Sequence, residues 1–356
     1  MKELKIFAIL VIFTGIVYWG VEPYAHSQMH EHTSAVNFDF KAGDIAQAEV
    51  ELAKAKESGK QDDIDFATTQ LENTKKLWEN VDKIASLKGD AETGKDDFEA
   101  NCSSCHDLAF DGFANINGEI GAQGIVVPDL STAGAIYDNK FLMAISINPA
   151  LAMKNHKKYN EENPHPMMTV FLEDDGSISD DNAQVVANIV AYLDSVGTKA
   201  LDDKKAKIAD EINASKLSDS EKAAKIDFEN NKIVFNEACV RCHDVKYDDN
   251  IAKINAGDFK EYMGSIAPDL SIIIRAKGED YLNKFINDTQ KQLPGTAMPR
   301  VGLNENAQKE VITYLTNVGD SKKAEREDLG YKIMIYFAIL AVLAYGWKSA
   351  IWRDLH

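Results

Sequence analysis

The sequence predicts an all-α protein: two similar helical units, preceded by a helical hairpin and bounded by an apolar helix at each end. Three observations lead to this prediction. One pentapeptide pattern occurs twice, with similar segments before and after each copy. Apolar residues recur at helical spacing in several of the segments that surround the two copies. An uncharged run stands near each end of the chain.

The composition is that of an acidic globular protein. The 356 residues include 39 Lys and Arg against 57 Asp and Glu, which gives a formal net charge of −18. A surface this acidic argues against nucleic acid as a partner and favours a basic protein reached by electrostatic steering. A well-solvated surface explains much of the acidity equally well.

The repeated pentapeptides are Cys102-Ser-Ser-Cys105-His106 and Cys239-Val-Arg-Cys242-His243. The pattern C-x-x-C-H is typical of covalent c-type haem attachment, in which two thiols add to the porphyrin vinyl groups and the His becomes the proximal iron ligand. A C-x-x-C pair alone could instead be redox-active or bind zinc. All four cysteines of the chain lie in the two motifs, and a four-thiolate zinc site would leave each His unused. The motifs therefore predict two covalently bound haem c groups.

The N-terminal uncharged run extends over 16 residues, from Ile6 to Val21. With Leu4 and a snorkelling Lys5 it is just long enough to cross a bilayer, which takes about 17–25 residues. A cleaved signal peptide is the alternative, but no A-x-A cleavage site follows the run. Residues 1–22 are therefore predicted to be a retained transmembrane anchor.

Residues 23–90 are predicted to form a juxtamembrane loop and a helical hairpin. The loop holds His26, His30 and His32, which would suit a metal or a partner subunit, although a plain polar loop explains them more simply. The two predicted helices end near Gly59 and at Gly89. The second places apolar residues on one broad face: Ile64, Phe66, Leu71, Trp78, Val81 and Ile84. The hairpin could pack on the haem units or dock another subunit, and the sequence leaves both open.

The two units are predicted at 91–198 and 224–320, because matching features recur about 137 residues apart. Phe98 and Phe235 each stand four residues before the first haem cysteine. The segment Pro-Asp-Leu-Ser begins at Pro128 and again at Pro268, and each unit closes with an amphipathic helix containing Tyr-Leu. Residues 199–223 are predicted to be a helical linker, and a capping box at Ser218 and Glu221 should start the next helix.

These units resemble class I cytochrome c domains, in which a helix ending in C-x-x-C-H, a proline loop, a Met and a closing Tyr-Leu helix follow in this order. The resemblance implies a small all-α fold around each haem. It also implies that the carbonyl group of Pro128 or Pro268 accepts a hydrogen bond from the proximal imidazole of His106 or His243.

The resemblance further implies a distal Met on each iron. In the second unit Met298, within Pro294-Gly-Thr-Ala-Met298-Pro299, fits this pattern. In the first unit Met167 is favoured over Met168, because it follows a proline. A bis-His iron, with His156 or His165 nearby, is the third possibility. Met/His ligation leaves no open position on the iron, which points to electron transfer and not to bond-making chemistry.

A second uncharged run extends from Ile333 to Trp347, and residues 329–352 are predicted to be a C-terminal transmembrane anchor. Haem c is attached on the outer side of the bacterial inner membrane. Two anchors that flank haem units in the periplasm therefore predict that both termini are cytoplasmic.

The stretch from Ala267 to Leu282 resembles the corresponding segment of cytochrome c1, and the whole layout resembles the diheme c1-type subunit of a bacterial quinol–cytochrome c oxidoreductase (cytochrome bc complex). This resemblance implies cytochrome b and the Rieske iron–sulfur protein as partners, and a soluble cytochrome c or a terminal oxidase as acceptor. It implies no catalysis by the chain alone. The chain departs from ordinary cytochrome c1, which has one haem and commonly lacks an N-terminal anchor and hairpin.

Two alternatives remain open. A diheme subunit of a cbb3-type cytochrome oxidase also has two cytochrome c domains, but a C-terminal anchor is not expected there. A diheme peroxidase would need an iron with an open or displaceable ligand, which a well-placed Met167 and Met298 argue against.

Overall fold

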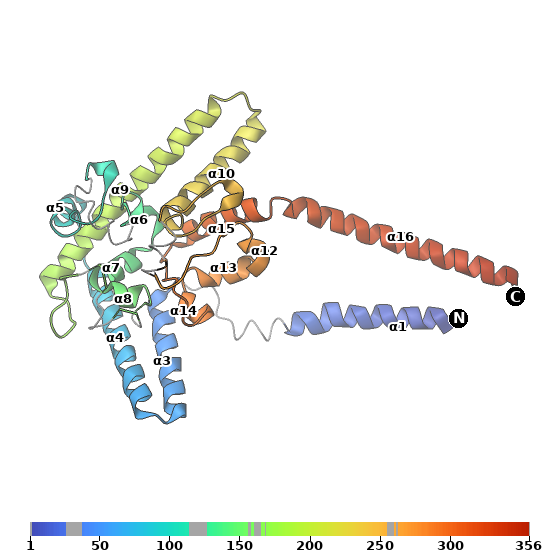
Figure 1. The fold of residues 1–356 in the computed structure, drawn as a ribbon, viewed down its shortest axis with the longest axis horizontal. Coiled ribbons are helices and arrows are strands. Elements are labelled where there is room, and N and C mark those ends of the chain that lie inside the picture. Colours follow the sequence, from blue (N-terminus) through green and yellow to red (C-terminus); the bar gives the residue numbers. More distant parts are fainter. Residues whose placement is uncertain are drawn as a thin grey trace.

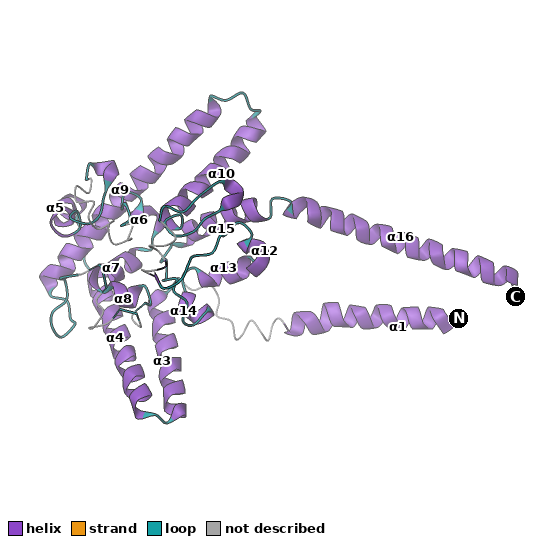
Figure 2. Ribbon diagram, viewed as in Figure 1, coloured by secondary structure: helices purple, strands orange, loops and turns teal. Residues whose placement is uncertain are grey.

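The computed structural model describes residues 2–25, 38–113, 127–155, 158–159, 165–167, 169–254, 260 and 263–355. Within these ranges every regular element is a helix, and the β pairing is confined to isolated bridges (Figure 2). The predicted all-α fold is confirmed. The three loop histidines, His26, His30 and His32, lie outside the described residues.

An apolar helix stands at each end of the chain. At the N-terminal end α1 (Lys2–Ile16) continues through a π-helical turn, η1 (Val17–Val21), and at the C-terminal end stands α16 (Lys323–Leu355). The stretches Lys2–Ala25 and Glu325–Arg353 are long and apolar enough to cross a membrane, and neither is buried against the rest of the protein. Both helices project from the same side of the helical body, and their free ends lie together at the far end (Figure 1).

The predicted hairpin consists of α3 (Phe40–Ser58) and α4 (Gln61–Ala85). Asp39 caps α3 by accepting from the backbone N–H of Ala42, and Gly59 ends it in the left-handed conformation, with φ +70°. The second helix ends at Ala85, short of the predicted stop at Gly89. The backbone of Gly89 instead packs directly against that of Ala187, since a Cβ at position 89 would lie only 2.3 Å from the Ala187 carbonyl oxygen.

The apolar face predicted for α4 is only partly buried. Trp78, Val81 and Ile84 are buried, whereas Phe66 is 52% exposed. The reason is the position along the hairpin: the end of α4 near Ile84 lies against the body of the protein, and the turn end of the hairpin projects away from it (Figure 1).

The first unit is organised around a crossing of its first and last helices. Gly94 lies at this crossing, where a Cβ would come within 2.1 Å of the carbonyl oxygen of Asn188, so only glycine fits. The predicted boundary at residue 198 falls inside the last helix, which continues through much of the predicted linker. The helices of the unit are α5 (Ala91–Asn101), η2 (Ala109–Asp111), α6 (Ala133–Ile136), α7 (Asn139–Ile147), α8 (Pro149–Ala152) and α9 (Asp180–Asn213).

The second unit begins with the predicted capping box. The Ser218 side chain and the Glu221 side chain each bond the other residue's backbone N–H, which confirms that prediction. Its helices are α10 (Asp219–Ala238), η4 (Lys246–Asp248), α12 (Ile273–Lys277), α13 (Glu279–Phe285), α14 (Thr289–Gln292) and α15 (Glu305–Gly319).

The two units share an extended interface. The backbone N–H of Asn304 donates to the carbonyl of Ile136 over 3.0 Å, and that of Asp138 donates to Gly302 over 3.0 Å. Ile136 is 1% exposed and belongs to the hydrophobic core of the second unit. The units are therefore held in one orientation by backbone hydrogen bonds and by a shared core.

Candidate haem sites

Each C-x-x-C-H motif begins where a helix ends. In the first unit Cys102 caps α5, and its N–H donates to the carbonyl of Phe98 over 2.8 Å. The N–H groups of Cys105 and His106 then donate to the carbonyl of Cys102, over 3.1 and 2.9 Å. This single helical turn gathers the two thiols and the imidazole at the end of one helix.

The second motif repeats this turn. Cys239 caps α10, and its N–H donates to Phe235 over 2.7 Å. The N–H groups of Cys242 and His243 both donate to the carbonyl of Cys239, over 3.0 Å each. The two motifs therefore have the same backbone hydrogen bonds.

Each motif histidine is held by the proline of its unit. Nδ1 of His106 lies 3.1 Å from the carbonyl oxygen of Pro128, and Nδ1 of His243 lies 2.8 Å from that of Pro268. A carbonyl only accepts, so Nδ1 carries the hydrogen. Burial lowers the pKa of both imidazoles, which keeps them neutral. Nε2 is then left with a free lone pair, as a proximal iron ligand requires.

None of the four cysteines is in a disulfide; Cys102, Cys239 and Cys242 are half-buried and Cys105 is exposed. Burial raises the pKa of Cys102 and of Cys239 to about 12. A redox-active C-x-x-C pair depends on a lowered thiol pKa, so these thiols do not suit that alternative. In the described parts of the chain no group of three or more His, Cys, Asp or Glu side chains is placed to hold a metal ion.

The Pro-Asp-Leu-Ser segment holds the loop that follows each motif. In the first unit the Ser131 hydroxyl donates to Asp129 over 2.5 Å and accepts from the N–H of Phe110 over 3.0 Å. In the second unit the Ser271 hydroxyl donates to Asp269 over 2.6 Å and accepts from the N–H of Tyr247 over 3.1 Å. The proline carbonyl that orients the imidazole is thus part of a hydrogen-bonded loop.

Sequence reasoning missed a second pair of supports. In the first unit the Tyr192 hydroxyl donates to Asp111 over 2.5 Å, and Lys95 lies 2.7 Å from the same carboxylate. In the second unit Tyr314 donates to Asp248 over 2.8 Å, and Lys232 lies 2.7 Å from it. The sequence did contain a signal for these contacts. Asp111 and Asp248 are 137 positions apart, as are Lys95 and Lys232, and this is also the separation of the two C-x-x-C-H motifs.

The predicted distal ligands lie in loops. Met298 is half-buried, and its N–H donates to the hydroxyl of Thr296 over 3.4 Å. Met167 is half-buried, and its N–H donates to Nδ1 of His165 over 3.1 Å. The structure therefore brings together the Cys, His and Pro residues of each unit, and the distal role of the two Met residues stays a prediction.

The hydrogen bond to Met167 bears on the bis-His alternative. Because Nδ1 of His165 accepts it, the hydrogen of the neutral imidazole is on Nε2, which then has no lone pair for an iron. Nε2 of His165 is also buried and has no hydrogen-bond partner among the described residues, so the bis-His alternative stays a prediction. His156 and Met168 lie outside the described residues.

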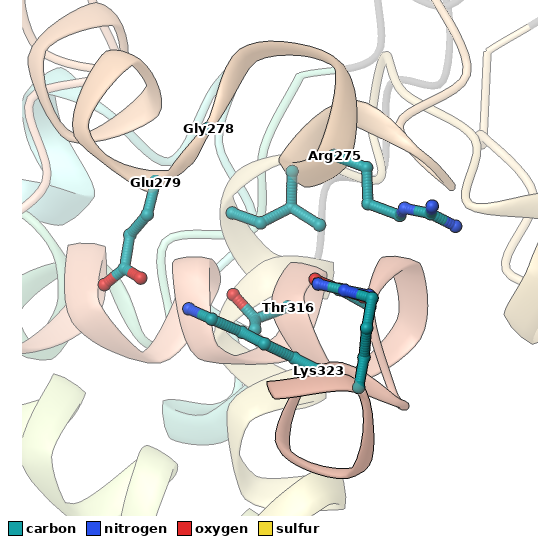
Figure 3. Close-up of a pocket in the computed structure, with 8 residues that line it drawn as sticks. Arg275, Gly278, Glu279, Thr316 and Lys323 are labelled. Atoms are coloured by element: carbon teal, nitrogen blue, oxygen red, sulfur yellow. The ribbon is translucent and has the colours of Figure 1, made fainter. Parts of the chain in front are cut away.

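A separate pocket of about 370 Å³ lies where α12, α13 and α15 meet the start of α16. Arg275, Lys323 and Glu279 are among its lining residues (Figure 3). No residue of either C-x-x-C-H motif lines it. The pocket is therefore not part of the candidate haem sites.

Comparisons with known proteins match only part of the chain. The family model described as "Cytochrome c" matches residues 91–197. A search of curated proteins found no match. A solved chain described as "Hyperthermophilic respiratory Complex III" is 21% identical, and the match covers 36% of this chain and 77% of that one with a TM-score of 0.30.

Proposed function

Because residues 91–197 form a cytochrome c domain, a type of domain that binds haem c covalently and transfers electrons, we propose that the whole chain is a membrane-anchored diheme cytochrome c. The evidence for a second haem is the structural correspondence between the two units. The helical turn of the motif, the His–Pro hydrogen bond and the Asp–Tyr–Lys contact all recur. The residues of the second motif therefore fit a haem as well as those of the first.

On this proposal Cys102 and Cys105 hold one haem and Cys239 and Cys242 hold the other, each through two thioether links. When bound, each haem supplies a one-electron redox centre whose potential depends on its axial ligands. The chain provides these ligands as His106 with Met167 and as His243 with Met298. The carbonyl oxygens of Pro128 and Pro268 accept the imidazole N–H, which fixes the orientation of each ring and raises its basicity.

We further propose that α1 and α16 anchor the chain in the bacterial inner membrane, with the haem units in the periplasm and both termini in the cytoplasm. Two features support this topology. Both apolar helices project from the same side of the body (Figure 1). Their distant ends also contact each other, because Lys348 pairs with Glu3.

The proposed place of the chain is in a quinol–cytochrome c oxidoreductase, beside cytochrome b and the Rieske protein. The support is the resemblance of residues 267–282 to cytochrome c1. One haem would take electrons from the Rieske protein, and the other would pass them to a soluble cytochrome c or to an oxidase. The oxidoreductase activity belongs to the assembly, and the chain contributes electron transfer.

Affinity purification of the full chain from its own membranes tests this proposal. Cytochrome b and a Rieske protein should copurify with it, and quinol should reduce its haems quickly in that assembly. If it copurifies with a haem–copper oxidase core and no Rieske protein, the proposal is wrong and the cbb3-type alternative is supported. Rapid peroxide turnover by the chain alone would instead support the peroxidase alternative.

A further inference from the structure

Asp44, near the start of α3 in the N-terminal hairpin, is a buried carboxylate that both haem units contact. It is 5% exposed. Arg300 of the second unit donates from Nη1 to Oδ2 over 2.9 Å and also pairs through Nη2 with Oδ1. Lys154 of the first unit lies 2.8 Å from Oδ1, and Trp78 of the hairpin donates to Oδ2 over 3.1 Å. The hairpin and the two units therefore meet at one carboxylate.

Arg300 is fixed along its whole length. It is 3% exposed, and its Nε donates to the carbonyl of Asn287 over 2.8 Å. Its backbone N–H donates to the carbonyl of Met153, in the first unit, over 3.0 Å. Its guanidinium carbon lies 4.9 Å from the ring centroid of Phe40. A bidentate guanidinium–carboxylate pair is directional, so Asp44 is one of the groups that fix where the Arg300 guanidinium lies.

Arg300 follows Met298 with only Pro299 between them, and proline restricts the backbone there. The chain beyond Arg300 is also held, because the side-chain oxygen of Asn287 accepts from the N–H groups of Gly302 and Leu303 over 3.0 Å each. The position of the Met298 segment is thus set from its C-terminal side, and the hairpin supplies one of the anchors.

We propose that Asp44 is a positioning residue for the second haem: through Arg300 it holds the Met298 segment in place. The inference rests on the proposed function, in which Met298 is the distal ligand of that haem. It also gives the hairpin a role. The start of α3 contacts the Met298 segment through the Asp44–Arg300 pair, so this part of the hairpin would support the second haem site.

The carboxylate is needed for its charge as well as its shape. Lys154 has a second acidic partner, Asp288, at 3.0 Å. Asp44 is the acidic side chain that pairs with Arg300 among the described residues. Asp44→Asn would leave a buried guanidinium without a counter-charge, and the expected response is a shift of Arg300 together with the segment that it holds.

The test uses the full-length chain with its haems, purified in detergent. The potentials of both haems are measured, together with the affinity of the oxidised protein for imidazole, which competes with the Met sulfur. In Asp44→Asn the second haem should bind imidazole at least tenfold more tightly, and its potential should fall.

The matched control is Glu72→Gln, which removes the same charge from an exposed position on α4 of the same hairpin. It should leave both haems unchanged, and Asp44→Glu should restore part of the effect. If Asp44→Asn and Glu72→Gln behave alike, the proposal is overturned.

Two further variants keep the test decisive. Asp44→Leu with Arg300→Met removes the pair without leaving an unpaired charge, so it should fold with both haems and still show the increased imidazole affinity. Met298→Ala identifies the transition that belongs to the second haem. If Met298→Ala alters that haem and no Asp44 variant does, this inference alone fails. If Met298→Ala alters neither haem, the ligand assignment in the proposed function fails as well.

Discussion

The hydroxyl group of Tyr192 donates a hydrogen bond to Asp111 over 2.5 Å, and this contact ties the closing helix of the first unit to the loop behind the haem motif. Tyr314 and Asp248 form the equivalent contact at 2.8 Å in the second unit. Each Tyr ring also packs on the Phe that precedes the motif: the ring centroids of Phe98 and Tyr192 lie 5.8 Å apart. The contact therefore supports the end of the helix that presents the cysteines.

Tyr192→Phe removes this hydrogen bond and keeps the ring. We expect a loss of about 1 kcal/mol in the free energy of unfolding. This is less than the roughly 1.5–3 kcal/mol usual for a hydrogen bond to a charged group, because Asp111 is partly exposed and keeps Lys95. Tyr314→Phe should cost a similar amount, and the two losses should add. Denaturant titrations followed by helical circular dichroism measure both. A cost below about 0.3 kcal/mol for each would show that the bond does not stabilise the fold.

The number of haems is predicted from the two complete motifs. The denatured full chain should keep the mass of two haems, and Cys102→Ala with Cys105→Ala should remove one of them. Cys239→Ala with Cys242→Ala should remove the other. Mass spectrometry of the intact denatured protein measures this directly. One haem in the unmodified chain contradicts the proposal.

The stability of the Asp44 contact should depend on pH. Burial alone would raise the pKa of Asp44, but the charges of Arg300 and Lys154 outweigh it and lower the pKa below its usual value. A lowered folded-state pKa contributes stability above the unfolded pKa of about 3.9, and this stability is lost as the pH falls through the folded-state value.

Asp44→Asn should therefore cost about 3–5 kcal/mol at pH 7, the usual cost of leaving a buried charge unpaired. The difference from the unmodified chain should shrink as the pH falls below about 4. Denaturant titrations of the unmodified chain and of Asp44→Asn at a series of pH values measure this difference in stability. The other acidic groups are the same in the two proteins, so their titration cancels in the difference. A difference that stays constant down to about pH 2 would contradict the assigned ion pair.

Electron transfer to the onward acceptor should depend on salt. The net charge of −18 favours a basic acceptor that docks electrostatically. Its rate of reduction should fall as the Debye length shortens from about 30 Å at 0.01 M to about 8 Å at 0.15 M ionic strength. Stopped-flow measurements over this range test it. A rate that does not change with salt would favour an acceptor held permanently in the same complex.

The ligation of the second haem has its own test. Met298→His should lower the potential of that haem, because bis-His ligation gives a lower potential than Met/His, and both thioether links should survive. Turnover from quinol to acceptor should then slow while the complex stays assembled. Redox titration and mass measurement on the same sample separate the two effects. An unchanged potential would exclude Met298 as a ligand.

Features that depend on neighbouring residues were predictable from the sequence. The C-x-x-C-H motifs, the capping box at Ser218 and the helix end at Gly59 each involve residues within one or two turns of one another. The pairing of His106 with Pro128 spans 22 residues and was implied by the repeated order of motifs and by the resemblance to class I cytochrome c domains. Because of the internal repeat, the elements of the second unit could be predicted from those of the first.

Only the tertiary structure decided which charged and apolar side chains are buried. Asp44 and Arg300 are 256 positions apart, and among 57 Asp and Glu residues no local pattern distinguishes the one that is buried. Phe66 fits the apolar face of α4 but is exposed, because the hairpin projects beyond the body there. Periodicity predicts which face of a helix is apolar. Burial depends on what packs against that face, and that is set by contacts between distant parts of the chain.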